Sequence, residues 1–161
     1  MIERPTRMLA VILERTEVRS RWETHRWELR AVVPDVGGEP RTLLETPAVL
    51  QRIHPGLPAT LFVDEAEGYH LNVTTAEPSV FVALRTPEEG GEPRPFQLTL
   101  SYNEAARWMD GGEVVERTPM WEELAEWVAA FAELHYRPEP KKRQRPRSFD
   151  GQGELREKKF T

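Results

Sequence analysis

The chain of 161 residues contains no cysteine. It therefore cannot form disulfides, thiolate zinc sites or cysteine-ligated iron–sulfur clusters, and it has no cysteine nucleophile. Long hydrophobic runs are missing as well, because the apolar run at residues 8–13 is followed at once by Glu14 and Arg15. Such a run is too short for the core of a signal peptide or for a membrane span. We therefore expect a cytoplasmic protein without a transmembrane segment.

The usual signatures of catalysis and phosphate binding are also absent from the sequence. Neither Gly-x-x-x-x-Gly-Lys nor Gly-x-Gly-x-x-Gly occurs, and we expect the pairs Gly90-Gly91 and Gly111-Gly112 to form turns. No serine lies in a Gly-x-Ser-x-Gly elbow, and no two histidines have the helical spacing of a metal site. We therefore assign no catalytic residue, no metal ligand and no tightly bound cofactor.

Lysine is absent from residues 1–136, which hold 13 arginines against 23 acidic side chains. Residues 137–161 reverse this balance, with 9 basic and 4 acidic residues after a proline-containing stop. The division predicts a single domain over residues 1–136 and a basic, flexible tail over residues 137–161 that can act as a docking arm. Five residues of this basic arm are candidate partner contacts: Lys141, Lys142, Arg143, Arg145 and Arg147. We do not expect nucleic-acid binding, because the acidic body would repel a phosphate backbone.

Several short segments alternate between apolar and polar residues, which is typical of strands with one buried face. In the first of them Trp27, Leu29, Ala31 and Val33 share a face. Residues 60–65 and 69–74 flank Ala66-Glu67-Gly68, which predicts a hairpin in which Gly68 takes a positive φ. The segments at residues 34–47 and 86–95 lack apolar periodicity, and we expect loops there.

Two further strands are predicted before the apolar pattern changes from a period of two to a helical period. Residues 79–85 are apolar on both faces, which predicts a central strand, and residues 96–100 should turn Phe96, Leu98 and Leu100 inward. Ser101 and Glu104 have the spacing of a capping box, so a helix should run from there to about Asp110 and end at Gly111-Gly112.

A short extended segment at residues 113–117 should lead into a second helix. Thr118-Pro119 suits its N-terminus, and the helix should end near Tyr136. Its apolar stripe consists of Trp121, Leu124, Val128, Phe131 and His135. The predicted fold class is α+β: a mainly antiparallel sheet of six to seven strands packed with two C-terminal helices, followed by the basic tail.

Trp22 and Trp27 lie close together near the start of a predicted strand. One or both could be partly exposed and serve as an anchor for a binding partner, since tryptophan is enriched at the centres of protein interfaces. Packing into the core is the alternative role. We include both residues among the candidate partner-binding residues.

The chain resembles a small bacterial family of unknown function, and the resemblance covers roughly residues 8–145. The residues that carry it are the runs at 67–72 (Glu-Gly-Tyr-His-Leu-Asn), 78–85, 100–106 (Leu-Ser-Tyr-Asn-Glu-Ala-Ala), 112–116, 118–120 and 127–131, flanked by Arg21-Trp22, Trp27, His135-Tyr136 and Lys141-Lys142-Arg143. Genes of this family commonly lie beside those of molybdenum-dependent formate dehydrogenase. The resemblance therefore implies a link to that enzyme.

Members of this family are sometimes labelled as molybdopterin-guanine dinucleotide biosynthesis proteins, which implies guanylyl transfer from GTP. Such transferases open with a glycine-rich nucleotide loop after the first strand and need an acidic Mg²⁺ site. Here residues 14–30 follow the first predicted strand without one glycine. The sequence argues against that label, and the resemblance supplies no catalytic residue.

These observations favour a non-catalytic accessory protein of a molybdenum-dependent formate dehydrogenase, either an assembly factor or a small bound subunit. One alternative is a carrier with the molybdopterin-type cofactor as transient cargo, whose phosphates would need arginines such as Arg26, Arg85, Arg94 and Arg107. Another is an enzyme of unknown type. The sequence leaves the contacted subunit and the oligomeric state open.

Overall fold

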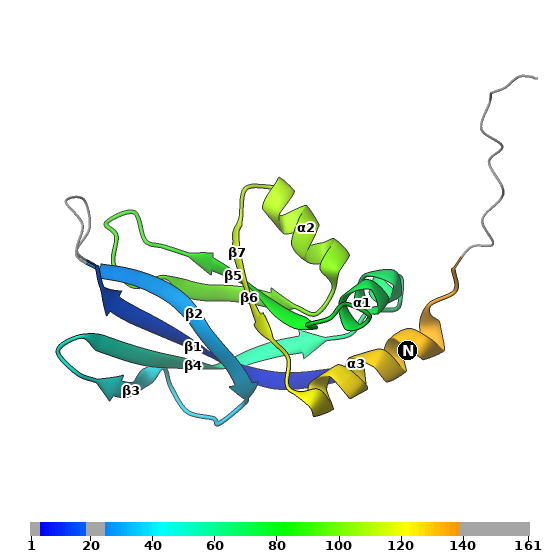
Figure 1. Ribbon diagram of the computed structural model, residues 1–161, viewed down its shortest axis with the longest axis horizontal. Coiled ribbons are helices and arrows are strands. Elements are labelled where there is room, and N and C mark those ends of the chain that lie inside the picture. Colours follow the sequence, from blue (N-terminus) through cyan, green and yellow to red (C-terminus); the bar gives the residue numbers. More distant parts are fainter. Residues whose placement is uncertain (1–3, 19–24, 139–161) are drawn as a thin grey trace, which may run out of the picture.

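The computed structural model describes residues 4–18 and 25–138. These residues form two antiparallel sheets and three α-helices, which confirms the predicted α+β class (Figure 1). The strands are β1 (Thr6–Glu17), β2 (His25–Pro34), β3 (Arg41–Glu45), β4 (Val49–Thr60), β5 (Ser79–Arg85), β6 (Arg94–Thr99) and β7 (Val114–Pro119). The α-helices are α1 (Ala66–Val73), α2 (Tyr102–Asp110) and α3 (Glu122–His135), with a 3-10 turn at Val63–Glu65 before α1.

The larger sheet has the order β2-β1-β4-β3, so β1 lies between two antiparallel neighbours. Leu9, Val11 and Leu13 of β1 are fully buried on the core side, as the alternation of a strand requires. On β2 the predicted face is only partly correct. The register shifts where Ile12 and Leu13 face Ala31 and Leu29, and this β-bulge moves Val32, instead of Ala31 or Val33, onto the core side.

The smaller sheet has the order β6-β5-β7, and β5 is its central strand, as predicted from its two apolar faces. Every residue of β5 except Arg85 is buried. The prediction holds for Leu98 of β6 and for Leu100, which directly follows the strand, but Phe96 is 49% exposed. A bulge between the pairs Ala83–Gln97 and Leu84–Pro95 interrupts the alternation at Phe96 and accounts for the difference.

The predicted hairpin at residues 60–74 is wrong, because the segment folds into the 3-10 turn and α1. Ala66, Tyr69 and Asn72 are buried at a spacing of three, which is helical, and Leu71 is exposed. Gly68 has no positive φ and lies inside the helix. Period-two and helical patterns coincide over so short a segment, and contacts with the rest of the chain decided between them.

Two other predicted boundaries differ from the structure. The loop expected at residues 34–47 contains β3, which pairs with β4 along the edge of the larger sheet. Thr118 and Pro119 belong to β7 and pair with Val80 and Ser79, so α3 begins after Trp121 instead. Leu124, Val128 and Phe131 of the predicted apolar stripe are buried on α3. The other two members are half-buried, Trp121 directly before the helix and His135 at its last residue.

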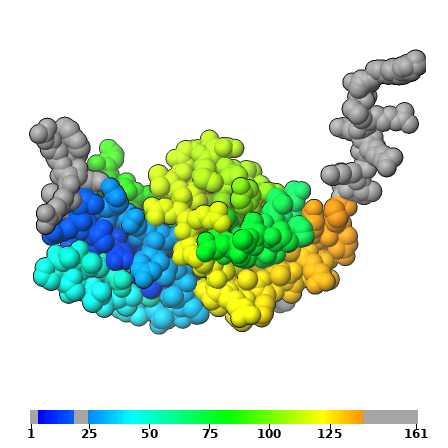
Figure 2. Space-filling view, in the orientation of Figure 1, coloured from blue at the N-terminus to red at the C-terminus, as the bar shows by residue number. Residues whose placement is uncertain are grey.

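The two sheets enclose one core, because β2 contacts β7 along one seam and β4 contacts β6 along the other. Helices α1 and α3 pack together at one end, where Leu61 and Tyr69 join the buried face of α3 in the same core (Figures 1 and 2). Helix α2 contacts α1 and all three strands of the smaller sheet. None of the helices within the described ranges is long and apolar enough to cross a membrane.

Candidate functional site

A cluster of hydroxyl and carboxylate groups joins α1 to α2. The Ser101 hydroxyl accepts a hydrogen bond from the Glu104 N–H at 3.0 Å, which is one half of the predicted capping box. The other half would be a bond from the Ser101 N–H to the Glu104 carboxylate, and this bond is replaced by a relay through Thr99. The Glu104 carboxylate accepts from the Thr99 hydroxyl at 2.5 Å, and Thr99 in turn accepts from the Ser101 N–H at 3.1 Å. The Ser101 hydroxyl also donates to Glu65, which pairs with Arg107, so this serine acts in packing.

Asn72 forms a second internal connection, between α1 and the smaller sheet. Its buried amide donates to the carbonyls of Ser79 and Leu100, both at 2.8 Å, and accepts from the Ser79 N–H at 3.0 Å. Three hydrogen bonds satisfy most of what a buried amide can form. Asn72 therefore fixes α1 against β5 and the end of β6.

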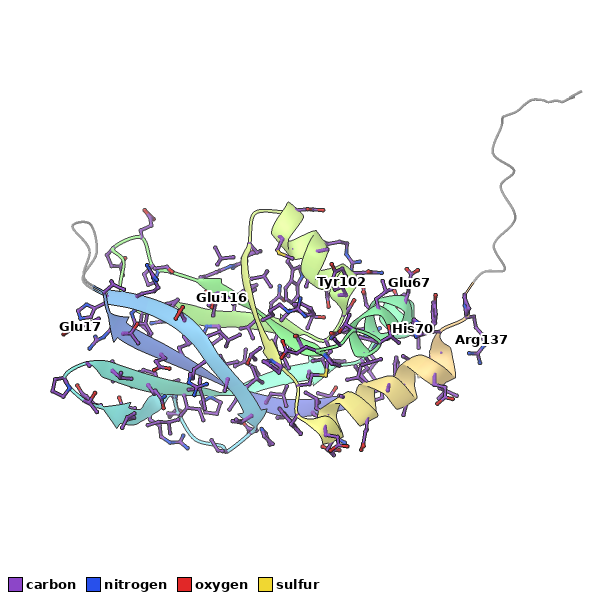
Figure 3. The ribbon with its side chains drawn as sticks, in the orientation of Figure 1. Glu17, Glu67, His70, Tyr102, Glu116 and Arg137 are labelled. Carbon is purple, nitrogen blue, oxygen red and sulfur yellow. The ribbon has the colours of Figure 1, made fainter. Side chains whose placement is uncertain are left out.

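An open groove lies where α1 and the end of α3 meet, with a volume of about 950 Å³. We call it the α1–α3 groove, and it is lined by Val63, Ala66, Glu67, His135, Tyr136, Arg137 and Pro138. The Tyr136 ring stacks on His70, with ring centroids 4.5 Å apart. Figure 3 shows Glu67, His70 and Arg137 gathered at this end of the molecule. The predicted hairpin had placed Glu67 in a turn, so the sequence did not indicate this groove.

The predicted partner-binding residues fall mostly outside the described part of the chain. This holds for Trp22 and for the basic arm residues Lys141, Lys142, Arg143, Arg145 and Arg147. Trp27 is half-buried on β2 and packs against the core, with the Arg15 guanidinium 5.8 Å from its ring centroid. Its packing role is observed, and its role as a partner anchor stays a prediction.

The four arginines named for a cofactor carrier lie on different elements. Arg26 is exposed on β2, Arg107 of α2 pairs with Glu65, and Arg85 of β5 pairs with Glu113 at 2.6 Å. This contact lowers the pKa of the Glu113 carboxyl below its ordinary value. Arg94 of this set lines a cavity at the seam between β4 and β6.

This seam cavity has a volume of about 450 Å³ and is lined by Pro40, Arg52, His54, Pro87, Glu92 and Arg94. Arg52 lies 3.3 Å from the Glu92 carboxylate, and the His54 imidazole lies 2.8 Å from it. The sequence did not indicate that Arg52 and His54 lie together. Glu92, the carboxylate that both contact, is 40 and 38 residues away from them in the chain.

A search of curated proteins and a search of solved structures found no match. One family model, described as a protein of unknown function, matches residues 8–145. This range agrees with the extent of the resemblance in the sequence. Because the model spans most of the 161 residues, the chain belongs to this family of unknown function, DUF3305.

Proposed function

We propose that the protein is a non-catalytic accessory protein that binds a molybdenum-dependent formate dehydrogenase, as an assembly factor or as a small subunit. The resemblance to a family encoded beside that enzyme supports the identity of the partner. The arrangement of the body, the α1–α3 groove and the basic arm supports a binding role.

The observation that carries the proposal is the position of the α1–α3 groove directly before the basic arm. Its wall ends at Arg137 and Pro138, where the acidic body gives way to the basic residues of the arm. Two large apolar side chains are exposed at this end: Val63 at the groove is 48% exposed, and Leu134 on the last turn of α3 is 64% exposed. A partner with an apolar contact beside an acidic surface would complement both features.

The hydroxyl and carboxylate groups of the two internal clusters support the non-catalytic reading. Ser101 and Asn72 already use their hydrogen-bonding groups to hold α1 against α2 and the smaller sheet. A side chain that acts as a nucleophile or general base must be free to reach the substrate. Packing accounts for these polar groups. We therefore expect the protein to act through the exposed end at which α1 and α3 meet.

The proposal is tested by purifying the tagged protein from its native host grown on formate and molybdate, followed by mass spectrometry and metal analysis. Stoichiometric formate dehydrogenase with molybdenum would identify a subunit. Substoichiometric enzyme without molybdenum would identify an assembly factor. Recovery of no formate dehydrogenase polypeptide under either growth condition would refute the proposal.

The role of the basic arm can be tested by changing Lys141, Lys142, Arg143, Arg145 and Arg147 to Gln together. We expect the affinity for the partner to fall about tenfold or more, since exposed ion pairs contribute up to about 1 kcal/mol each. The loss should shrink at high salt, where the wild-type contact is itself screened. For a comparison at equal charge, the control changes Arg156, Lys158 and Lys159 to Gln and is set against the triple variant in which Lys141, Lys142 and Arg143 become Gln. Equal loss in both triple variants would mean that net charge, and not this part of the arm, determines binding.

A further inference from the structure

Two polar residues of β4 occupy positions on the core side of the larger sheet. Arg52 pairs with Leu13 and His54 pairs with Val11, and both partners on β1 are fully buried in the core. Residues directly opposite each other in an antiparallel pair point to the same face. Arg52 and His54 therefore extend between the two sheets at the β4–β6 seam. A guanidinium and an imidazole in such positions lose part of their hydration, which calls for an explanation.

Glu92 satisfies both residues at once. One carboxylate oxygen lies 2.8 Å from His54 Nε2, and Arg52 Nε approaches the two oxygens at 3.3 and 3.4 Å. The Arg52 guanidinium also donates to the Thr42 hydroxyl at 3.1 Å, which fixes its direction. The donors thus converge on one place at the seam, and a carboxylate occupies that place.

The occupying carboxylate belongs to the loop between β5 and β6, in which residues 88–91 are exposed and Pro93, directly after Glu92, is buried. Glu92 follows Gly90 and Gly91, whose φ values are 84° and 101°, and nothing lies within 4 Å of a Cβ built on either glycine. Pro93 anchors the end of this loop, and within the loop the Gly90 N–H donates to the Pro87 carbonyl at 2.8 Å. The Glu92 side chain extends from the loop to Arg52 and His54. An anion that competes for Arg52 and His54 could displace Glu92 without unpacking the core.

Arg94 lines the same cavity and brings a third donor group to it. Within residues 4–18 and 25–138, the Arg94 side chain forms no hydrogen bond or ion pair. Its register neighbour across the sheet is another arginine, Arg85, which adds to the positive potential there although Glu113 pairs with it. Arg52 and His54 contact the carboxylate, and Arg94 adds a second guanidinium to the cavity. This set of donors suits the larger charge and the additional oxygens of a phosphate.

We propose that the seam cavity binds a phosphate group, with Arg52, His54 and Arg94 donating to its oxygens and with the Glu92 carboxylate standing where the phosphate would bind. A volume of about 450 Å³ is larger than a phosphate needs, and it lies in the range of small-molecule pockets. The cavity can therefore hold free phosphate or the phosphate of a small ester, whose organic part would lie against Pro40 and Pro87. This site is independent of partner binding by the groove and the arm.

The test is isothermal titration calorimetry of the full chain with inorganic phosphate and with glycerol 3-phosphate. We expect Glu92→Gln to bind phosphate about tenfold or more tightly than the wild type, because it removes the competing charge. Arg94→Gln should weaken binding by about fivefold or more in the same background. The control is Arg30→Gln, an exposed arginine of β2 that pairs with Glu14 and loses the same charge.

Thermal unfolding gives a second readout. If Glu92 only holds the sheets together, Glu92→Gln will lower Tm and added phosphate will not restore it. The proposal predicts instead that phosphate raises the Tm of Glu92→Gln more than that of the wild type. Tighter binding of glycerol 3-phosphate would identify an ester as the ligand, and equal or tighter binding of inorganic phosphate would identify the free ion. Equal phosphate affinity in the wild type, Glu92→Gln and Arg94→Gln would overturn the proposal.

Discussion

Tyr69 shows how one side chain combines packing with hydrogen bonding. Its ring is buried on α1 and meets Phe131 of α3 edge-on, with centroids 5.7 Å apart. Its hydroxyl accepts from the Phe62 N–H at 2.9 Å. Burial raises the pKa of the Tyr69 phenol well above its ordinary value, although the bond from Phe62 acts in the opposite direction. The neutral phenol is therefore part of the folded state.

We predict that Tyr69→Phe lowers the free energy of unfolding by about 1–3 kcal/mol at neutral pH, because the Phe62 N–H loses its acceptor. The difference between wild type and variant should narrow above about pH 10. The folded-state pKa of Tyr69 is raised, so the unfolded chain releases the proton first and wild-type stability falls as pH rises. Urea unfolding at neutral and alkaline pH measures both effects. Tyr102→Phe, at an exposed tyrosine of α2, is the control and should show neither.

At the scale of elements, Gly68 determines how closely α1 approaches the start of α2. A Cβ built at Gly68 would lie 2.0 Å from the Ser101 hydroxyl oxygen and 3.1 Å from the Asn103 backbone nitrogen. The sequence suggested that this glycine serves a turn. The structure shows that the missing side chain is required by the contact between helices, since any Cβ would overlap the residues that begin α2.

Gly68→Ala should therefore cost about 2–3 kcal/mol of unfolding free energy, in the range of overpacked cores, in spite of the better helix propensity of alanine. The matched control is Gly111→Ala at the end of α2. Its φ is −83° and the nearest contacts of a built Cβ are at 3.5 Å, so we expect a change within about 0.5 kcal/mol. Chemical denaturation followed by circular dichroism compares the two. If both variants have similar free energies of unfolding, α1 and α2 can move apart to admit a methyl group without a loss of stability.

At the scale of the whole molecule, carboxylates connect the two sheets at both seams. Glu92 does so between β4 and β6, and Glu116 of β7 accepts from the Leu29 N–H of β2 at 2.8 Å. Strand β2 is an edge strand of the larger sheet, and the Leu29 N–H donates to this side chain instead of to a neighbouring strand. Glu116 lies in the middle of the molecule in Figure 3, between the sheets it connects.

We predict that Glu116→Ala lowers unfolding free energy by about 1–3 kcal/mol, since the partly buried Leu29 N–H is left without an acceptor. Glu116→Gln keeps a carbonyl oxygen at the same place and should recover most of the loss. Hydrogen exchange at the Leu29 amide, with thermal unfolding, measures the effect. If Gln is as destabilising as Ala, the negative charge and not the hydrogen bond closes this seam.

The sequence by itself determined the α+β class, the central position of β5, the capped start of α2 and the family. These features depend on local signals: β5 is apolar on both faces, and Ser101 lies three residues before Glu104. The division into an acidic body and a basic arm is likewise a property of composition.

Only the tertiary structure decided that residues 66–73 form a helix, that Phe96 turns outward and that Val32 turns inward. It alone brought Arg52 and His54 to Glu92, and Arg137 to Glu67 at the groove. The physical reason is that periodicity records which face of a local element is apolar. Bulges, helix contacts and seams depend on residues far apart in the chain, whose distances no local pattern contains.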